Sequence, residues 1–178
     1  MKVYLIGYPS CGKTTLGKKV AKKLGYTFVD LDLLFEEMYH TTISDFFEKY
    51  GEYAFRINEQ KLLHSTSEME NTVIATGGGT PCFFDNMDYI NHNGISIYIR
   101  KPANFLVDRL RNAKKVRPLF RNISIEDLPK YIETQLAERE PYYLKAQIVT
   151  AVQSPEEIIQ LLDDYFNPNR SLEKVQLV

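Results

Sequence analysis

The sequence lacks the features that define several broad classes of protein. None of its apolar runs approaches the roughly 18–20 residues that a membrane-spanning helix needs. Its 178 residues carry a formal net charge of −1, which gives no general attraction to nucleic acid or anionic membranes. No basic leader or signal-type segment precedes the first apolar run. We therefore expect a cytoplasmic protein without nucleic-acid or membrane partners.

Cysteine is also scarce. The two cysteines, Cys11 and Cys82, lie beside glycine-rich stretches and form no framework pattern, so we expect reduced thiols. Cys11 lies near a predicted helix N-terminus, a position that lowers thiol pKa values, but we interpret it as a bystander.

The chain shows no internal repeat, linker or second domain. With 44% hydrophobic and 25% charged residues, it has the composition of an ordinary globular protein. We predict a single domain over residues 1–178, with a lid at about 111–122 and a C-terminal extension at 167–178. Nothing in the sequence demands more than a monomer.

The most informative stretch is residues 7–15, GYPSCGKTT, which fits the phosphate-binding pattern G-x-x-x-x-G-K-[ST]. Glycine permits backbone conformations in which N–H groups converge on phosphate oxygens, and the helix that follows points its positive end at the same atoms. Lys13 adds a positive charge for the β- and γ-phosphates, and the Thr14 hydroxyl is placed to ligate Mg²⁺. An accidental match at a strand-turn-helix corner is the alternative. The predicted ATP-binding residues here are Ser10, Cys11, Gly12, Lys13, Thr14 and Thr15.

Short apolar runs alternate with helical patterns along the chain. The runs cover residues 1–6, 26–29, 72–75, 95–99 and 147–152. Strands that alternate with helices indicate a parallel sheet with helices on both faces. We predict an α/β protein with a three-layer P-loop kinase fold and a five-stranded, mainly parallel sheet. This pattern alone does not separate a kinase from a GTPase or a regulatory nucleotide binder.

Helical spacing and capping residues predict the elements between the strands. The predicted helices cover residues 13–24, 33–50, 52–69, 84–91, 104–112, 131–140 and 154–166, with a shorter one over 124–128. Residues 41–44 interrupt the second helix, where Ser44 is a predicted N-cap, and Gly51 breaks it. Gly25 and Ser154 are a predicted C-cap and N-cap.

Two stretches are predicted to meet the phosphate-binding loop at one edge of the sheet. Asp30 and Asp32 follow the second strand, and three glycines at 77–79 follow the third. Ligands of open α/β sheets bind at the carboxyl ends of the strands. Consecutive glycines after a buried strand suggest a backbone that lies close to a ligand, although a flexible turn is the alternative.

Positive charge is concentrated at two further places. Residues 111–121 form a basic segment in an otherwise neutral chain, which is typical of a lid that closes over phosphates; an exposed basic loop is the alternative. Arg56 lies near the start of a predicted helix. It is either a functional cation or an ordinary surface arginine, solvated or paired with Glu52 or Glu59.

These motifs together resemble the successive signatures of the shikimate kinase family. They comprise residues 7–15, FVDLD at 28–32, GEYAFRINE at 51–59, GGG at 77–79, RPL at 117–119 and EREPYY at 138–143. They occur in the family's order and with similar spacing, from residue 1 to about 166. The resemblance implies ATP-dependent phosphorylation of the 3-hydroxyl of shikimate, on the route to chorismate and the aromatic amino acids.

The resemblance also implies roles on the acceptor side of the site. Asp32 would bind the ring hydroxyls of shikimate and help deprotonate the attacking one. Arg56 and Arg139 would hold the substrate carboxylate, a task that suits the planar, bidentate guanidinium group. Gly78 and Gly79 would contact the substrate through their backbone.

On the nucleotide side, the resemblance implies that Arg117 reaches the ATP phosphates from the lid and acts in catalysis with Lys13. Asp30 would support Mg²⁺ through water, alongside Thr14. Two loop positions depart from the family pattern, because Ser10 stands where glycine is usual and Cys11 where serine or alanine is usual. The residues implied near the adenine are Arg111, Gln153 and Pro155.

Two other functions stay open. A kinase of another small acceptor, such as gluconate or a nucleoside monophosphate, shares the phosphate loop, and gluconate also has a carboxylate for the arginines. A non-catalytic nucleotide-binding switch is the second alternative. The sequence contains neither N-K-x-D nor D-x-x-G, the signatures of a GTPase.

Overall fold

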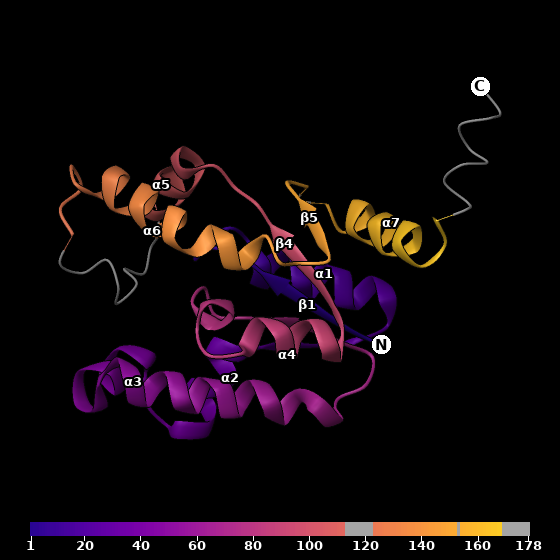
Figure 1. The fold of residues 1–178 in the computed structure, drawn as a ribbon, viewed down its shortest axis with the longest axis horizontal. Coiled ribbons are helices and arrows are strands. Elements are labelled where there is room, and N and C mark those ends of the chain that lie inside the picture. Colours follow the sequence, from indigo (N-terminus) through magenta and orange to yellow (C-terminus); the bar gives the residue numbers. More distant parts are fainter. Residues whose placement is uncertain (113–122, 153, 169–178) are drawn as a thin grey trace.

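The computed structural model describes residues 1–112, 123–152 and 154–168. Its core is a sheet of parallel strands in the order β2-β3-β1-β4-β5 (Figure 1). The strands are β1 (Lys2–Ile6), β2 (Thr27–Asp30), β3 (Thr72–Ala75), β4 (Ile95–Ile99) and β5 (Ile148–Thr150). The predicted α/β fold is confirmed, with every strand pair parallel.

Seven α-helices occur in the described residues. They are α1 (Lys13–Leu24), α2 (Leu31–Tyr39), α3 (Ile43–His64), α4 (Asn86–Asn93), α5 (Ala103–Arg111), α6 (Leu128–Tyr143) and α7 (Pro155–Phe166), with short 3₁₀ turns η1 (Ser65–Glu68) and η2 (Thr80–Cys82). Helices α1 and α7 pack side by side on one face of the sheet, and α4 and α6 lie on the other (Figure 1). The sheet therefore forms the middle of three layers.

The strands consist of apolar runs because both faces of the sheet are covered. In β1, Val3, Tyr4, Leu5 and Ile6 are fully buried. This strand is central, pairing with β3 on one side and β4 on the other. The carboxyl ends of the strands meet at one edge, which is where the chain places the phosphate loop, the acidic residues and the glycine loop.

Several predicted boundaries need correction. Thr42, not Ser44, caps α3: its hydroxyl oxygen accepts a hydrogen bond from the N–H of Asp45 at 3.1 Å. Gly51 does interrupt the helical backbone, with φ of 78°. The helix predicted over 52–69 ends earlier, at His64, and a 3₁₀ turn follows it.

The C-terminal half differs in similar ways. The helix predicted to end at Glu140 continues through Pro141, which lacks an N–H, to Tyr143, and the N–H of Leu144 still bonds to the Glu140 carbonyl. No separate helix forms over 124–128, where α6 begins at Leu128. Strand β5 ends at Thr150, earlier than predicted. The N–H of Val152 bonds to the Thr150 hydroxyl instead of taking part in strand pairing.

Some predictions fall outside the described residues. Almost all of the lid at 111–122 does so, as do Arg117, Gln153 and residues 169–178 of the predicted extension. The organisation of residues 1–178 as one domain therefore stays a prediction. In the part of the chain that the structure describes, no helix is both long and apolar enough to cross a membrane.

Candidate active site

The phosphate loop turns sharply between β1 and α1. Gly7, Ser10 and Gly12 have φ values of 142°, 69° and 107°, and only glycine adopts such conformations freely. Ser10 thus takes a backbone conformation for which glycine is the usual residue, at a cost of about 1–2 kcal/mol. The loop therefore keeps a left-handed backbone at this position although a serine stands there.

Lys13 lies over this loop and is 9% exposed. Its ammonium group donates to the carbonyl oxygens of Gly7 at 2.7 Å and Tyr8 at 3.2 Å. The sulfur of Cys11 is 3.8 Å from the same nitrogen, and Cys11 itself is buried beneath the loop. A phosphate oxygen is a stronger acceptor than a carbonyl, so the ammonium group is held next to the loop and can exchange partners.

Thr14 and Asp30 are linked directly. The Thr14 hydroxyl donates to Asp30 Oδ2 at 2.6 Å, while Asp30 Oδ1 accepts from the N–H of Asp32 at 3.1 Å. Asp30 is therefore the N-cap of α2 and also the last residue of β2. Capping fixes the carboxylate beside α1, so that a hydroxyl and a carboxylate oxygen face the same space.

This oxygen pair fits Mg²⁺. Magnesium in phosphoryl-transfer sites is held by one or two protein oxygens, with phosphate and water oxygens completing the octahedron. A set of three or more His, Cys, Asp or Glu side chains that could enclose a metal is absent among the described residues. The donor set therefore suits a metal that arrives with a nucleotide better than one caged by protein alone.

A cavity of about 580 Å³ lies against the phosphate loop. Its other wall is the face of α5. The lining residues are Ser10, Gly12, Lys13, Thr14, Thr15, Phe105, Asp108, Arg109 and Asn112. Its size is within the range of small-molecule sites.

The wall from α5 was missed by sequence reasoning. Residues 105, 108, 109 and 112 recur at helical spacing, which marks one face of a helix, but no local signal says what that face covers. The guanidinium carbon of Arg109 lies 5.4 Å from the centre of the Phe105 ring.

Arg111, predicted near the adenine, does not line the cavity and donates instead to the Ile125 carbonyl at 3.4 Å. Pro155 begins α7, outside the lining residues.

The glycine loop at 77–79 touches three separate parts of the site. A side-chain carbon added at Gly77 would lie 2.7 Å from Asp32 Oδ1, and one added at Gly78 would lie 2.4 Å from the ring of Pro9. One added at Gly79 would lie 2.6 Å from the guanidinium group of Arg56. These distances are shorter than van der Waals contact, so each glycine is required for close approach and the loop is no mere flexible turn.

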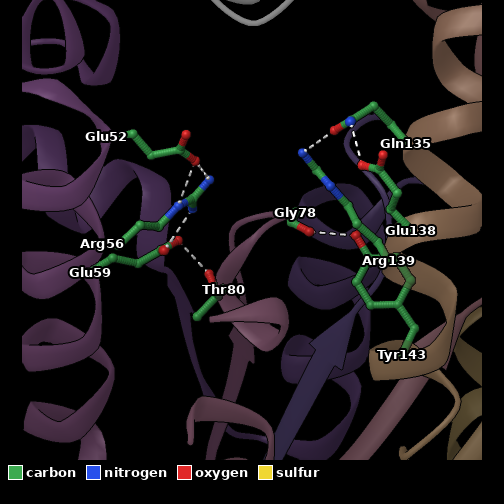
Figure 2. Close-up of polar contacts among 9 residues, drawn as sticks. All are labelled: Glu52, Arg56, Glu59, Gly78, Thr80, Gln135, Glu138, Arg139 and Tyr143. Atoms are coloured by element: carbon green, nitrogen blue, oxygen red, sulfur yellow. Dashed lines mark hydrogen bonds and ion pairs between the residues drawn. The ribbon is translucent and has the colours of Figure 1, made fainter. Parts of the chain in front are cut away.

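Arg56 is buried, with 5% exposure, and is held by two carboxylates (Figure 2). Glu59 accepts from Nη1 at 2.8 Å, and Glu52 accepts from Nη2 at 3.0 Å and from Nε at 3.2 Å. Glu59 is itself fixed by the hydroxyl of Thr80, which donates to its other oxygen at 2.6 Å. The pairing considered from the sequence is therefore present, and it positions the guanidinium group against the glycine loop.

Aromatic rings cover the faces of the same guanidinium group. Its central carbon lies 4.1 Å from the centre of the Phe83 ring, 5.1 Å from that of Phe55 and 5.8 Å from that of Phe47. Such contacts strengthen as water is excluded. Sequence reasoning missed Phe83, because only the folded chain brings η2 next to α3.

Arg139 approaches from the opposite side. It projects from α6, its guanidinium group donates to Gln135 at 2.8 Å, and it lies 5.5 Å from the ring of Tyr8 in the phosphate loop. Burial would lower the pKa of Arg139, but the nearby Tyr143 and Tyr8 phenols raise it above the ordinary value. In Figure 2, Arg56 and Arg139 flank the glycine loop from α3 and α6.

These observations define a class of protein. A phosphate loop follows the central strand of a parallel α/β sheet, and a second, arginine-flanked site lies across a loop that touches it. This combination is that of a P-loop kinase that phosphorylates a small acidic molecule.

Comparisons with known proteins identify the family. The pattern that defines shikimate kinase matches residues 9–166. A shikimate kinase of Parabacteroides distasonis is 44% identical over 147 residues, which cover 83% of this chain and 85% of that protein. The crystal structure of shikimate kinase from Bacteroides thetaiotaomicron is 38% identical with a TM-score of 0.87, covering 94% of this chain and 98% of that one.

A third relative was solved with a bound ligand. Shikimate kinase from Acinetobacter baumannii, solved in complex with shikimate, is 30% identical with a TM-score of 0.82 and covers 94% of this chain and 93% of that one. The chain belongs to the shikimate kinase family. It is an ATP-dependent phosphotransferase that acts on the 3-hydroxyl of shikimate, and the two alternative functions are not supported.

Proposed function

We propose that the two sites described above divide the work of the shikimate kinase reaction between a phosphate half and an acceptor half. In the phosphate half, residues 10–15 hold the ATP phosphates, and Lys13 leaves the loop carbonyls to contact the β- and γ-phosphates. The burial of Lys13 beside the loop supports this role, because the ammonium group needs only a local movement to change partners.

Thr14 and Asp30 are the residues that would hold Mg²⁺ on the protein side, Asp30 through water. When bound, Mg²⁺ would supply charge neutralisation for the β- and γ-phosphate oxygens. The hydrogen bond of 2.6 Å between the two side chains supports the assignment, since it aims both oxygens at one place.

The acceptor half holds shikimate by its carboxylate. Arg56 and Arg139 donate to the carboxylate from opposite sides, and the backbone of Gly78 and Gly79 contacts it from below. The single observation that carries this proposal is the contact of Gly79 with the Arg56 guanidinium group, in a loop that Arg139 flanks from the other side (Figure 2). Two guanidinium groups beside a bare backbone form a receptor for a planar anion.

Asp32 then faces the reacting hydroxyl. Its carboxylate lies against Gly77, two residues from the Gly79 end of the loop that holds the carboxylate. The 3-hydroxyl oxygen forms a bond to the γ-phosphorus while the bond to the β,γ-bridging oxygen breaks, and the hydroxyl proton passes to Asp32. The products are shikimate 3-phosphate and ADP. Placement and charge neutralisation dominate such a transfer, and Lys13 offsets charge on the leaving group.

Other assignments of the site remain predictions. Arg117 is proposed to reach the phosphates from the lid, where closure would exclude water from the transfer. Arg111, Gln153 and Pro155 are proposed near the adenine. The cytoplasmic location, the monomeric state and the absence of nucleic-acid and membrane partners also stay predictions.

A coupled assay of ADP release tests the proposed acceptor half. We expect release to depend on shikimate, and Arg139→Ala to raise the KM for shikimate by about 10–100-fold, since hydrogen bonds to charged groups contribute about 1.5–3 kcal/mol each. The KM for ATP should stay within about twofold, since Arg139 is assigned to the carboxylate alone. Unchanged shikimate kinetics in Arg139→Ala would reject its assignment to the carboxylate.

A further inference from the structure

A buried tyrosine connects α6 to the middle of the glycine loop. Tyr143, the last residue of α6, is fully buried, and its hydroxyl donates to the carbonyl oxygen of Gly78, 65 residues earlier in the chain (Figure 2). The residue lies one helical turn after Arg139, on the same face of the helix. One helix thus provides a guanidinium group and an anchor for the loop.

The hydrogen bond from Tyr143 to the Gly78 carbonyl also fixes the direction of the next N–H group. The described residues contain no cis peptide bond, and in a planar trans peptide the C=O and the next N–H point in opposite directions. Holding the Gly78 carbonyl toward Tyr143 therefore turns the N–H of Gly79 away from α6. Among the described residues, the Gly79 N–H donates to no backbone carbonyl, so it is available to an acceptor.

The loop needs such an anchor because it is made of glycine. Glycine has the largest conformational freedom of any residue, and an N–H donor that rotates freely binds an anion poorly. The turn bonds Thr80 N–H to Gly77 and Cys82 N–H to Gly79 fix the loop on either side of the Gly78 carbonyl. Pro9 touches the α-carbon of Gly78 but offers no donor to its carbonyl.

We propose that Tyr143 is a positioning residue of the acceptor site: its hydroxyl orients the Gly78–Gly79 peptide so that the Gly79 N–H and the Arg139 guanidinium group address the same substrate carboxylate. This inference rests on the proposed acceptor half described above. Tyr143 touches neither the substrate nor the reacting atoms, so it acts through the loop.

The chemistry of the phenol suits a permanent donor. Burial raises the pKa of Tyr143 well above its usual value, and the thiol of Cys82 raises it further, against an opposing effect of Arg139. The hydroxyl therefore keeps its proton at pH values where a free phenol would already have ionised.

A structural role alone is the competing explanation, because any buried hydroxyl that loses its partner destabilises a protein. Tyr4 provides a matched control. It is also fully buried, and its hydroxyl forms a hydrogen bond of 3.1 Å with the hydroxyl of Thr66 in η1, not with the glycine loop. Tyr4→Phe and Tyr143→Phe each remove one buried hydroxyl and one hydrogen bond.

The test measures the KM for shikimate, the KM for ATP, kcat and the Tm of the full chain, for both variants and for Arg139→Ala. We expect Tyr143→Phe to raise the KM for shikimate by about tenfold, with kcat and the KM for ATP within about twofold of the parent. Both tyrosine variants should lower the Tm by similar amounts. Tyr4→Phe, however, should leave the KM for shikimate, the KM for ATP and kcat within about twofold of the parent.

The possible failures can be told apart. An unchanged KM for shikimate in Tyr143→Phe, with a raised KM in Arg139→Ala, would overturn the positioning role and leave the proposed acceptor half intact. Equal kinetic losses in Tyr143→Phe and Tyr4→Phe would show a purely structural role and overturn it as well. An unchanged KM in Arg139→Ala would instead remove the acceptor half on which the inference rests.

Discussion

The phosphate half and the acceptor half of the site are built in different ways. Most of the proposed phosphate half comes from one continuous stretch, residues 7–15, whose groups for binding phosphate are mostly main-chain atoms, and Asp30 joins it from the end of β2. The acceptor half is assembled from α2, α3, the loop after β3 and α6, and it contributes Asp32, Arg56, the glycines and Arg139. In the proposed assignment, recognition of phosphate is thus mostly local in the chain, whereas recognition of shikimate depends on how distant elements pack.

The difference also appears in how charge is managed. In the proposed phosphate half, the ammonium group of Lys13 rests on carbonyl oxygens that a phosphate can replace. Arg56 is buried, and its charge is compensated by Glu52 and Glu59 and covered by aromatic rings. An isolated buried charge is strongly unfavourable, so these partners, chiefly the buried Glu59, keep the guanidinium group in place before the substrate arrives.

The largest effect should follow the loss of Lys13. We expect Lys13→Ala to lower kcat by about 10²–10³-fold, because it removes the positive charge that stabilises the leaving phosphate. Shikimate binding, measured by calorimetry without nucleotide, should stay within about twofold. A large loss of shikimate affinity would break the separation of the two halves.

The two carboxylates on Arg56 should differ. Glu59 is buried and fixed by Thr80, so Glu59→Gln should raise the KM for shikimate by about 10–100-fold, as expected for loss of a charged hydrogen bond. The side chain of Glu52 is 55% exposed, and such partly solvated pairs contribute about 0–1 kcal/mol. Glu52→Gln, the matched control, should change the KM by about threefold or less. Equal effects would show that burial does not decide the strength of these pairs.

Two glycine variants should show the smallest difference between the halves, in the KM values for the two substrates. A methyl group at Gly79 meets the flexible end of Arg56. Gly79→Ala should therefore raise the KM for shikimate by about tenfold and leave the KM for ATP unchanged. A methyl group at Gly78 meets the ring and the backbone nitrogen of Pro9, so Gly78→Ala should raise the KM values for both substrates. Steady-state kinetics of both variants checks this, and the reverse pattern would contradict the contacts of the loop.

The contrast between the halves explains what the sequence could predict. Parallel strands and caps such as Ser154 depend on neighbouring residues, and these predictions are confirmed. The phosphate-binding role of residues 10–15 also follows from a local pattern and stays a prediction. The family and its reaction were also predicted, because the motifs occur in order along the chain. Thr42 was missed as the cap of α3, since both Thr42 and Ser44 suit the role and only the position of the first helical turn decides.

Tertiary contacts account for the rest. Phe83, the anchor Tyr143 and the α5 wall of the cavity touch their partners across long separations in the chain, which no local pattern encodes. The continuation of α6 through Pro141 belongs to the same group, because its packing against η2 and α5 outweighs the missing hydrogen bond.

The central claim is that shikimate is held by its carboxylate between two arginines across a glycine loop, with its reacting hydroxyl toward Asp32. A crystal structure of the enzyme with shikimate and a non-hydrolysable ATP analogue tests it most directly. We predict hydrogen bonds of about 2.7–2.9 Å from Arg56 and Arg139 to the carboxylate, with the 3-hydroxyl within reach of Asp32 and facing the γ-phosphate. A carboxylate bound away from both arginines, or a 3-hydroxyl turned away from the phosphate loop, would contradict the account.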